Sequence, residues 1–141
     1  MRKLFIICAL LFCLGTASAQ QKFSVASPDG KLKLVLDIAP EKVAYSVKYR
    51  KQQLLEDSRL GFEFDSGEFG AGLKAGKVQR RKIDEAYELV VGKVRRARNY
   101  CNEMTVPLVE RNGKERTVNL IVRAFDDGIA FRYEFPEQKA W

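Results

Sequence analysis

Alternating apolar and polar residues run through most of the chain, and the pattern is clearest from residue 118 to residue 136. Residues 129–135 place an apolar side chain at every second position, which is the period of a strand with one buried face. Residues 118–125 are partly apolar on both faces, which indicates an interior strand. Asp126-Asp127-Gly128 joins the two runs, and Asp-Gly here is a strong hairpin signal because glycine tolerates a positive φ. The pattern predicts a hairpin with Gly128 in the left-handed region.

Shorter alternating runs precede this hairpin. They cover residues 23–26, 31–38, 43–49, 60–64 and 104–108. Ser27-Pro28-Asp29-Gly30 predicts a tight, exposed turn, and Asn112-Gly113 predicts a second hairpin turn. Short strands at a spacing of roughly 8–12 residues are typical of an all-β sandwich or barrel. We therefore predict an all-β fold, and nothing in these runs indicates a helix.

Several other stretches have a less regular pattern. Residues 51–57 fit either a connection or a short strand, and residues 78–94 fit either a strand around 87–91 or a longer loop. Residues 65–76 carry four glycines and predict a flexible loop, because the lysine and hydroxyl pair of a phosphate-binding loop is missing. Pro107 has no amide hydrogen, which predicts a sheet edge or a bulge at this position.

The first 19 residues have the three parts of a secretory signal peptide. Arg2 and Lys3 are basic, residues 4–14 are apolar, and Ala17-Ser18-Ala19 is a small-residue cleavage site. A membrane-spanning helix would need about 20 apolar residues. We predict cleavage after Ala19 and export, with the periplasm as the destination, so that the mature domain covers residues 20–141.

The cysteines argue against a lipid anchor and against a disulfide. Cys8 and Cys13 follow large apolar residues, whereas a lipid-modified cysteine follows a small one, so we predict no membrane anchor. Cleavage would leave Cys101 alone in the mature chain, and one cysteine cannot form an internal disulfide. The chain has no histidine, so Cys101 is predicted to be a buried, inert thiol rather than a nucleophile.

The net charge of +7 is moderately basic. Loss of Arg2 and Lys3 would leave 23 basic against 18 acidic residues, a net charge of +5. The excess lies in residues 74–82 and 93–98, which could bind a polyanion. Solvated strand faces explain these runs better, and we predict no nucleic-acid partner.

Four segments, in this order, resemble a known family. They are residues 27–31 (S-P-D-G-K), 58–61 (S-R-L-G), 100–103 (Y-C-N-E) and 123–136 (R-A-F-D-D-G-I-A-F-R-Y-E-F-P). Together they are similar to the amino-terminal domain of glycoside hydrolase family 97, which includes exported α-glucosidases and α-galactosidases of Bacteroidetes. The resemblance covers residues 23–138.

The resemblance implies an antiparallel β-sandwich of the galactose-mutarotase-like kind, packed in the intact enzyme against a following (β/α)8 barrel. In the family, the catalytic carboxylates and most calcium-binding carboxylates come from later in the polypeptide. Since the printed chain ends at Trp141, we expect a sandwich incomplete at its carboxyl-terminal side, with no catalytic residue, metal ligand or cofactor of its own. The implied partners are the barrel and a saccharide with α-glycosidic linkages.

The implied role is to support and flank the barrel and to shape the sugar-binding cleft. Two alternatives stay open: a stand-alone periplasmic carbohydrate-binding module, and a non-functional fragment. A fragment would aggregate, because a sandwich without some of its strands exposes unpaired edges.

Charged residues in the predicted strands are candidate sugar ligands. Glycoside hydrolysis needs two carboxyl groups on opposite sides of the scissile bond, and no such pair is identifiable. Asp126 and Asp127 are predicted to accept hydrogen bonds from nearby amides in their turn. Arg123, Arg132 and Glu134 could line a sugar groove, but cross-strand ion pairs are the favoured prediction.

The remaining candidates are polar and aromatic. Asn102 and Glu103 fit either a domain interface or a hydrogen-bond network in a loop. The tyrosines in strand register are predicted to pack in the core rather than to stack on sugars; they are Tyr45, Tyr49 and Tyr133. Trp141 lies at the very end of the chain, with no strand to hold it.

Overall fold

The computed structural model describes residues 20–65, 67–90, 95–111, 113 and 115–139. Eleven strands, and no helix, are assigned within these residues. The first sheet contains four antiparallel strands in chain order: β1 (Gln21–Ala26), β2 (Leu32–Ile38), β3 (Val43–Tyr49) and β4 (Gln52–Leu60).

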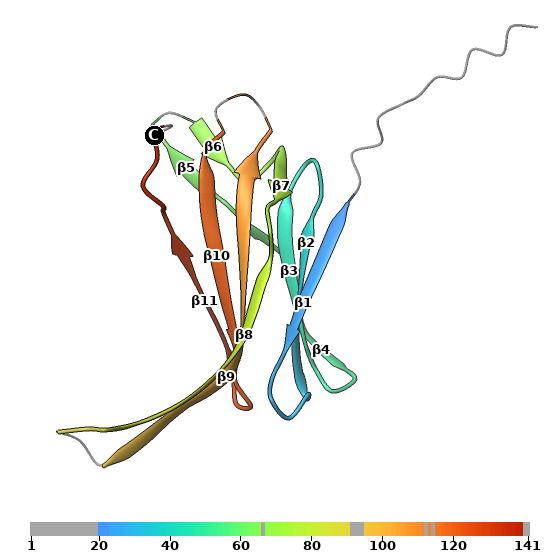
Figure 1. Cartoon of the computed structure of the whole chain (residues 1–141). Coiled ribbons are helices and arrows are strands. Elements are labelled where there is room, and N and C mark those ends of the chain that lie inside the picture. Colours follow the sequence, from blue (N-terminus) through green and yellow to red (C-terminus); the bar gives the residue numbers. More distant parts are fainter. Residues whose placement is uncertain (1–19, 66, 91–94, 112, 114, 140–141) are drawn as a thin grey trace, which may run out of the picture.

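The second sheet has five strands. They are β7 (Leu73–Ala75), β8 (Gln79–Glu88), β9 (Arg96–Glu110), β10 (Thr117–Ala124) and β11 (Ile129–Glu134). Their order is β11-β10-β9-β7, and β8 also pairs with β9. A small two-stranded sheet contains β5 (Phe62–Phe64) and β6 (Gly67–Phe69). The two large sheets face each other, and the β8–β9 hairpin extends beyond the sandwich (Figure 1). The predicted all-β antiparallel sandwich is confirmed.

The core lies between the inner faces of the two large sheets, where alternate residues of each strand meet. The residues at its centre are at most 2% exposed: Leu34, Leu36, Ile38, Met104, Val106, Leu108, Val118, Leu120 and Val122. Three tyrosines pack against this core and are partly buried, as predicted: Tyr45, Tyr49 and Tyr133. Since the inner faces are filled by apolar residues, only outer faces and edges offer polar surface for a ligand.

The predicted hairpin near the end of the chain forms, but its turn differs from the prediction. β10 is an interior strand between β9 and β11, as expected. The Phe125 N–H donates to the Gly128 carbonyl at 2.8 Å, so Asp126 and Asp127 are the two central turn residues. Gly128 is not among the residues with positive φ. The prediction that Gly128 supplies the left-handed conformation is therefore wrong, because it occupies a paired position after the turn.

The glycine-rich stretch is not a loop, and the less regular stretches around it are strands. Instead, β6 and β7 lie within residues 65–76. Phe69 and Leu73 are 1% and 2% exposed, so their side chains anchor this segment to the core. Gly67, the first residue of β6, and Gly72, between β6 and β7, have positive φ. Residues 52–60 form the continuous strand β4, whose register with β3 shifts at irregularities. β8 begins at Gln79, earlier than the predicted strand.

Pro107 lies in an interior strand, so the prediction of a sheet edge is wrong. Its carbonyl accepts a hydrogen bond from Gly76 at 2.8 Å and therefore faces the gap between β7 and β8. Since the N–H and C=O of one residue in an antiparallel strand face the same neighbour, the missing donor falls at this gap. A Cβ on Gly76 would lie 3.0 Å from the proline ring. The pairing of β9 with β7 and β8 is thus interrupted opposite Pro107, whereas the register with β10 continues without a bulge.

Candidate functional site

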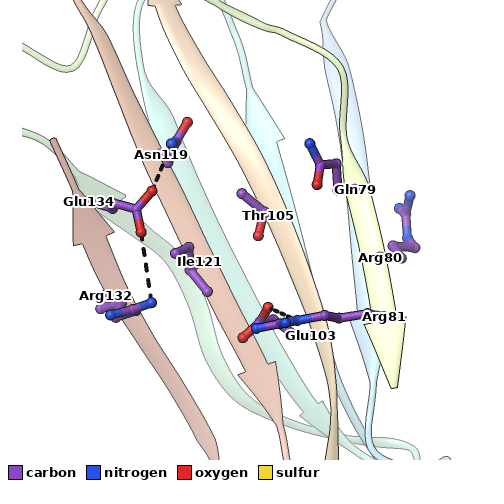
Figure 2. Close-up of a pocket in the computed structure, with 9 residues that line it drawn as sticks. All are labelled: Gln79, Arg80, Arg81, Glu103, Thr105, Asn119, Ile121, Arg132 and Glu134. Atoms are coloured by element: carbon purple, nitrogen blue, oxygen red, sulfur yellow. Dashed lines mark hydrogen bonds and ion pairs between the residues drawn. The ribbon is translucent and has the colours of Figure 1, made fainter. Parts of the chain in front are cut away.

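A polar hollow lies on the outer face of the five-stranded sheet, across four strands. The register places Gln79, Thr105, Ile121 and Arg132 in one row across the sheet. Arg81, Glu103 and Arg123 form the neighbouring row. Outer-face positions repeat at every second residue, so four strands contribute side chains to one surface. The hollow has a volume of about 330 Å³ (Figure 2).

An ion-pair triad forms one end of the hollow. Arg81 Nε donates to Glu103 Oε1 at 2.6 Å, and Arg123 Nε donates to Glu103 Oε2 at 2.7 Å. The Glu103 side chain is 5% exposed, whereas that of Arg81 is 65% exposed. Glu103 therefore holds two arginines in place across β8, β9 and β10, and the predicted cross-strand ion pair of Arg123 is confirmed.

The pKa of Glu103 results from two opposing effects. Burial acts to raise it, but the hydrogen bonds and charges of Arg81 and Arg123 together outweigh burial, and the pKa lies below its ordinary value of 4.5. A carboxylate held in its ionised form cannot donate a proton at neutral pH. Glu103 is thus suited to positioning the arginines rather than to acid catalysis.

The opposite end of the hollow carries a second polar cluster. Asn119 Nδ2 donates to Glu134 Oε1 at 3.1 Å, and Arg132 Nη2 lies 3.8 Å from Glu134 Oε2. Arg132 and Glu134 both belong to β11, so the prediction of a cross-strand ion pair is wrong for these two residues. Ile121 lies between the two clusters (Figure 2) and is 6% exposed. The hollow therefore combines an apolar floor with amide, guanidinium and carboxylate groups at its ends, which can bond to hydroxyl groups.

Acidification is expected to destabilise the domain in part through Glu103. Because its folded pKa is lowered, the unfolded chain binds the proton more readily, so this stability is present above about pH 4.5 and is lost as pH falls through the folded pKa. Glu103→Gln should flatten the decline in unfolding free energy measured by urea titration between about pH 7 and pH 3. Glu41→Gln, at an exposed bend between β2 and β3, is the control, and an unchanged decline in Glu103→Gln would contradict the prediction.

Comparison with known proteins identifies the family. The family model described as glycosyl-hydrolase 97 N-terminal matches residues 25–141. The chain belongs to this family. A retaining α-galactosidase of Bacteroides thetaiotaomicron is 28% identical over 134 residues, which are 94% of this chain and 19% of the relative. A probable retaining α-galactosidase of Streptomyces bingchenggensis is 29% identical over 137 residues, which are 94% of this chain and 21% of that protein.

Solved structures agree with this assignment. A family 97 enzyme of Pseudoalteromonas sp. strain K8, in complex with panose, matches with a TM-score of 0.78 and 30% identity over 83% of this chain and 18% of that protein. A β-arabinopyranosidase matches with a TM-score of 0.76 and 34% identity, over 84% of this chain and 19% of its own. The family 97 N-terminal domain described here thus spans about a fifth of the length of the relatives that it matches.

Other residues singled out in the sequence have structural roles in this family 97 N-terminal domain. Asn102 Nδ2 donates to the Ala26 carbonyl at 2.8 Å and so connects β9 with β1. Asp126 Oδ1 accepts from the Asp29 N–H at 2.8 Å. The predicted structural role of Asp126, which is to accept a hydrogen bond from a backbone amide, is confirmed, but its partner lies in a turn 97 residues away in the sequence.

The remaining candidates do not form a site. Asp127 is exposed at the tip of its turn. Cys101 is fully buried, and burial raises the pKa of its thiol, as expected for an inert thiol. The predicted turn around Ser27 forms, with the Gly30 N–H donating to the Ser27 carbonyl at 2.9 Å, but Ser27 is only 2% exposed rather than at the surface. Trp141 and residues 1–19, 91–94 and 112 lie outside the described residues.

Most of the residues that line the hollow were not singled out from the sequence. Gln79 and Thr105 were not singled out, and Arg81 was noted only as part of a basic run. Once β8 is known to begin at Gln79, alternation places Gln79 and Arg81 on one face, so the signal was present but depended on the strand boundary. Nothing local indicated Glu110 and Arg116, which form a buried ion pair outside the hollow.

No metal site or membrane helix is found in the part of the chain that the structure describes. The acidic and cysteine side chains of these residues form no group of three that could hold a metal ion, so they do not fit the calcium ion expected of the full-length family enzyme. The described residues also contain no apolar helix of membrane-spanning length.

Proposed function

We propose that this domain supports and flanks the catalytic barrel of a family 97 glycoside hydrolase and contributes a saccharide-binding surface. The family match over residues 25–141 supports the first part. The relatives are retaining α-galactosidases, and structures of the family include complexes with panose and acarbose. On the basis of these relatives, we propose that the substrates are α-linked galactosides or glucosides.

The observation that carries the saccharide part is the polar hollow. Its arginines, amides and carboxylates converge from four strands on a buried isoleucine floor, and ligand sites commonly combine an apolar surface with a few convergent polar groups. The planar Arg81 guanidinium is fixed by Glu103 through Nε, and its side chain is largely exposed toward a ligand. Such a group can bond to two neighbouring hydroxyls of one sugar.

We assign binding rather than hydrolysis of a glycosidic bond to the hollow. Hydrolysis requires one carboxyl group that donates a proton and a second that attacks or activates water. Glu103 is held ionised by two arginines, so it cannot take the first role. The proposed contribution is therefore binding and support, with catalysis left to other parts of the enzyme.

Saccharide binding is tested by calorimetry on the purified protein with maltooligosaccharides and α-galactosides. We expect measurable binding that Gln79→Ala weakens about tenfold, a loss of about 1.4 kcal/mol, because the Gln79 amide lines the hollow. Gln52→Ala, at an exposed position on β4 in the other sheet, is the matched control and should leave binding unchanged. No heat with any of these sugars would contradict the saccharide part, and hydrolysis of an aryl α-glycoside would contradict the absence of catalysis.

The alternative function is a stand-alone periplasmic carbohydrate-binding module. The same hollow favours it, since saccharide binding does not require a barrel. An antibody against residues 20–141 distinguishes the two functions in extracts of the source cells. A polypeptide several times longer than 141 residues supports the glycosidase domain, whereas a single short product supports the module.

Residues 1–19 are proposed to direct export to the periplasm. The basic, apolar and small-residue regions occur in the order of a signal peptide. When the chain is produced in a bacterial host with its own leader, mass spectrometry of the periplasmic protein should show Gln20 as the first residue. Ala19→Arg should block processing, because the cleavage site requires a small residue. Retention of residues 1–19 on the exported wild-type protein would refute this proposal.

A further inference from the structure

A second hollow adjoins the polar hollow, at the side of the sandwich where β1 approaches the second sheet. Residues 24–26 of β1, 80–82 of β8 and 102–103 of β9 line it, and its volume is about 380 Å³. We call it the side hollow. Arg80, Arg81 and Glu103 line both hollows. Figure 2 shows Arg81 directed toward Glu103, and Arg80 on the opposite side of β8.

The walls of the side hollow are held together by contacts between the two sheets. Asn102 Nδ2 donates to the Ala26 carbonyl at 2.8 Å, and Arg80 Nη2 lies 3.5 Å from the Ser24 carbonyl. A third bond, of 2.9 Å, ties the start of β1 to β7. These contacts within the domain fix β1 against the second sheet, so the shape of the side hollow does not depend on an open sheet edge.

Two basic side chains of β8 project into the side hollow from the inner side of the sheet. Arg80 lies opposite Met104 in the register, and Lys82 lies opposite Asn102. Residues directly opposite on neighbouring strands place their side chains on the same face, and Met104 is fully buried in the core. Arg80 and Lys82 therefore continue the core face, yet both are exposed because this part of the face opens into the side hollow.

The side hollow has an excess of positive charge. The carboxylate that lines it, Glu103, already accepts hydrogen bonds from two arginines. Lys82 Nζ lies 4.8 Å from the centroid of the Tyr100 ring, a contact that orients the ammonium without neutralising it. The Arg80 guanidinium carries N–H donors in a planar fork that matches a carboxylate or a sulfate. Arg80 and Lys82 are two residues apart on one face, a spacing of about 7 Å, so one oxyanion can contact both.

We propose that the side hollow binds a carboxylate or sulfate group of a saccharide whose neighbouring sugar unit occupies the polar hollow. Guanidinium and ammonium groups form charge-assisted hydrogen bonds to both anions, and these are about twice as strong as bonds between neutral groups. The proposal rests on the saccharide part of the proposed function and narrows the ligands to acidic α-galactosides or α-glucosides. The neutral unit would lie against the amides and the buried Ile121 of the polar hollow, and the acidic group would reach Arg80 and Lys82.

Calorimetry with matched disaccharides tests the anion site. The probes are α-linked galactobiose, the corresponding disaccharide of galacturonic acid, and galactobiose sulfated at a primary hydroxyl. The purified protein should bind at least one acidic probe about tenfold more tightly than galactobiose, and the tighter of the two identifies the anion. Arg80→Gln and Lys82→Gln should each lower this ratio of affinities about fivefold or more, because each removes one charge from the side hollow.

The matched control is Lys48→Gln, which removes the same charge from an exposed position on β3 and should leave the ratio unchanged. The ratio is measured within each protein. A variant that misfolds would therefore be recognised by the loss of both affinities, and the other variant would then decide the outcome.

The possible failures of the two proposals are distinguishable. Galactobiose binding without a preference for either acidic probe would overturn the anion site alone, as would occur if a carboxylate of another segment of the polypeptide filled the side hollow. An equal loss of preference in Lys48→Gln would show general attraction to a basic protein and would also overturn it. No heat with any of the three probes would contradict both the anion site and the saccharide part of the proposed function.

Discussion

Replacing Arg116 with methionine is expected to lower the free energy of unfolding by about 3–5 kcal/mol, a large part of the roughly 5–15 kcal/mol that stabilises a typical domain. The Arg116 and Glu110 side chains are 2% and 1% exposed. Nε and Nη2 of Arg116 each donate to one Glu110 oxygen at 2.7 Å. Methionine would fill much of the space but would remove the guanidinium charge that lies against the buried Glu110 carboxylate.

Arg116 also connects the two-stranded sheet to the sandwich. Its guanidinium carbon lies 5.8 Å and 6.0 Å from the ring centroids of Phe64 and Phe69. Nη2 also approaches the Glu68 carbonyl at 3.4 Å. Loss of the arginine should therefore loosen β5 and β6 as well, and hydrogen exchange of their amides should increase together with the loss of stability.

The matched control for this prediction is Arg98→Met. Arg98 and Asp84 form an ion pair of the same two-bond geometry, at 2.7 Å and 2.8 Å, but their side chains are 61% and 50% exposed. Exposed pairs contribute little because water and salt screen them. Urea denaturation should show a much smaller loss for Arg98→Met. Similar losses for the two variants would show that burial is not the source of the effect.

A double variant distinguishes the buried charge from lost packing. Glu110→Leu combined with Arg116→Met removes both charges, and replacement of a whole buried ion pair by apolar residues is often neutral or stabilising. We expect this double variant to recover most of the stability that Arg116→Met loses. A double variant as unstable as the single one would point to lost packing rather than to loss of the charge that faces Glu110.

Leu120→Ala is expected to cost about 2–5 kcal/mol, because it removes a large side chain from a closely packed interior and leaves a cavity. Leu120 is 1% exposed in β10 and lies between Val106 of β9 and Tyr133 of β11 in the register. The measurement is the urea unfolding transition of the purified protein. Leu55→Ala is the control, since Leu55 is 46% exposed on β4 and its removal leaves no enclosed cavity.

This second prediction also tests the alternative of a non-functional fragment. A loosely collapsed chain would show no cooperative transition, and its stability would respond about equally to Leu120→Ala and Leu55→Ala. A cooperative transition with a large difference between the two variants would establish a packed core in the chain as it stands.

Several local features were correctly predicted from the sequence, and the reasons for the failures differ. The hairpin at residues 118–135 has long alternating runs on both sides of a turn, so the prediction needed no tertiary information. The short strands β6 and β7 have three residues each, too few for a period to appear, and the four glycines of residues 65–76 suggested a loop. Pro107 suggested an edge because the sequence does not show that its missing donor faces a gap between two strands.

The candidate hollow could be predicted only in part. Arg123, Arg132 and Glu134 stood out because charges interrupt apolar strands. Gln79 and Thr105 did not, since polar residues at the outer face of a strand are common. Their contribution follows from the register between strands, which no single segment contains.

The amino-acid sequence by itself determined the all-β fold, the family and the inner and outer faces of the main strands. Each of these depends on residue type and on a two-residue period that acts within one segment. The tertiary structure decided which strands are neighbours, and hence the Arg81–Glu103–Arg123 triad and the Asp126 bond to Asp29. It also decided that Glu110 and Arg116 are buried. These features depend on contacts between segments far apart in the chain, for which the sequence carries no local pattern.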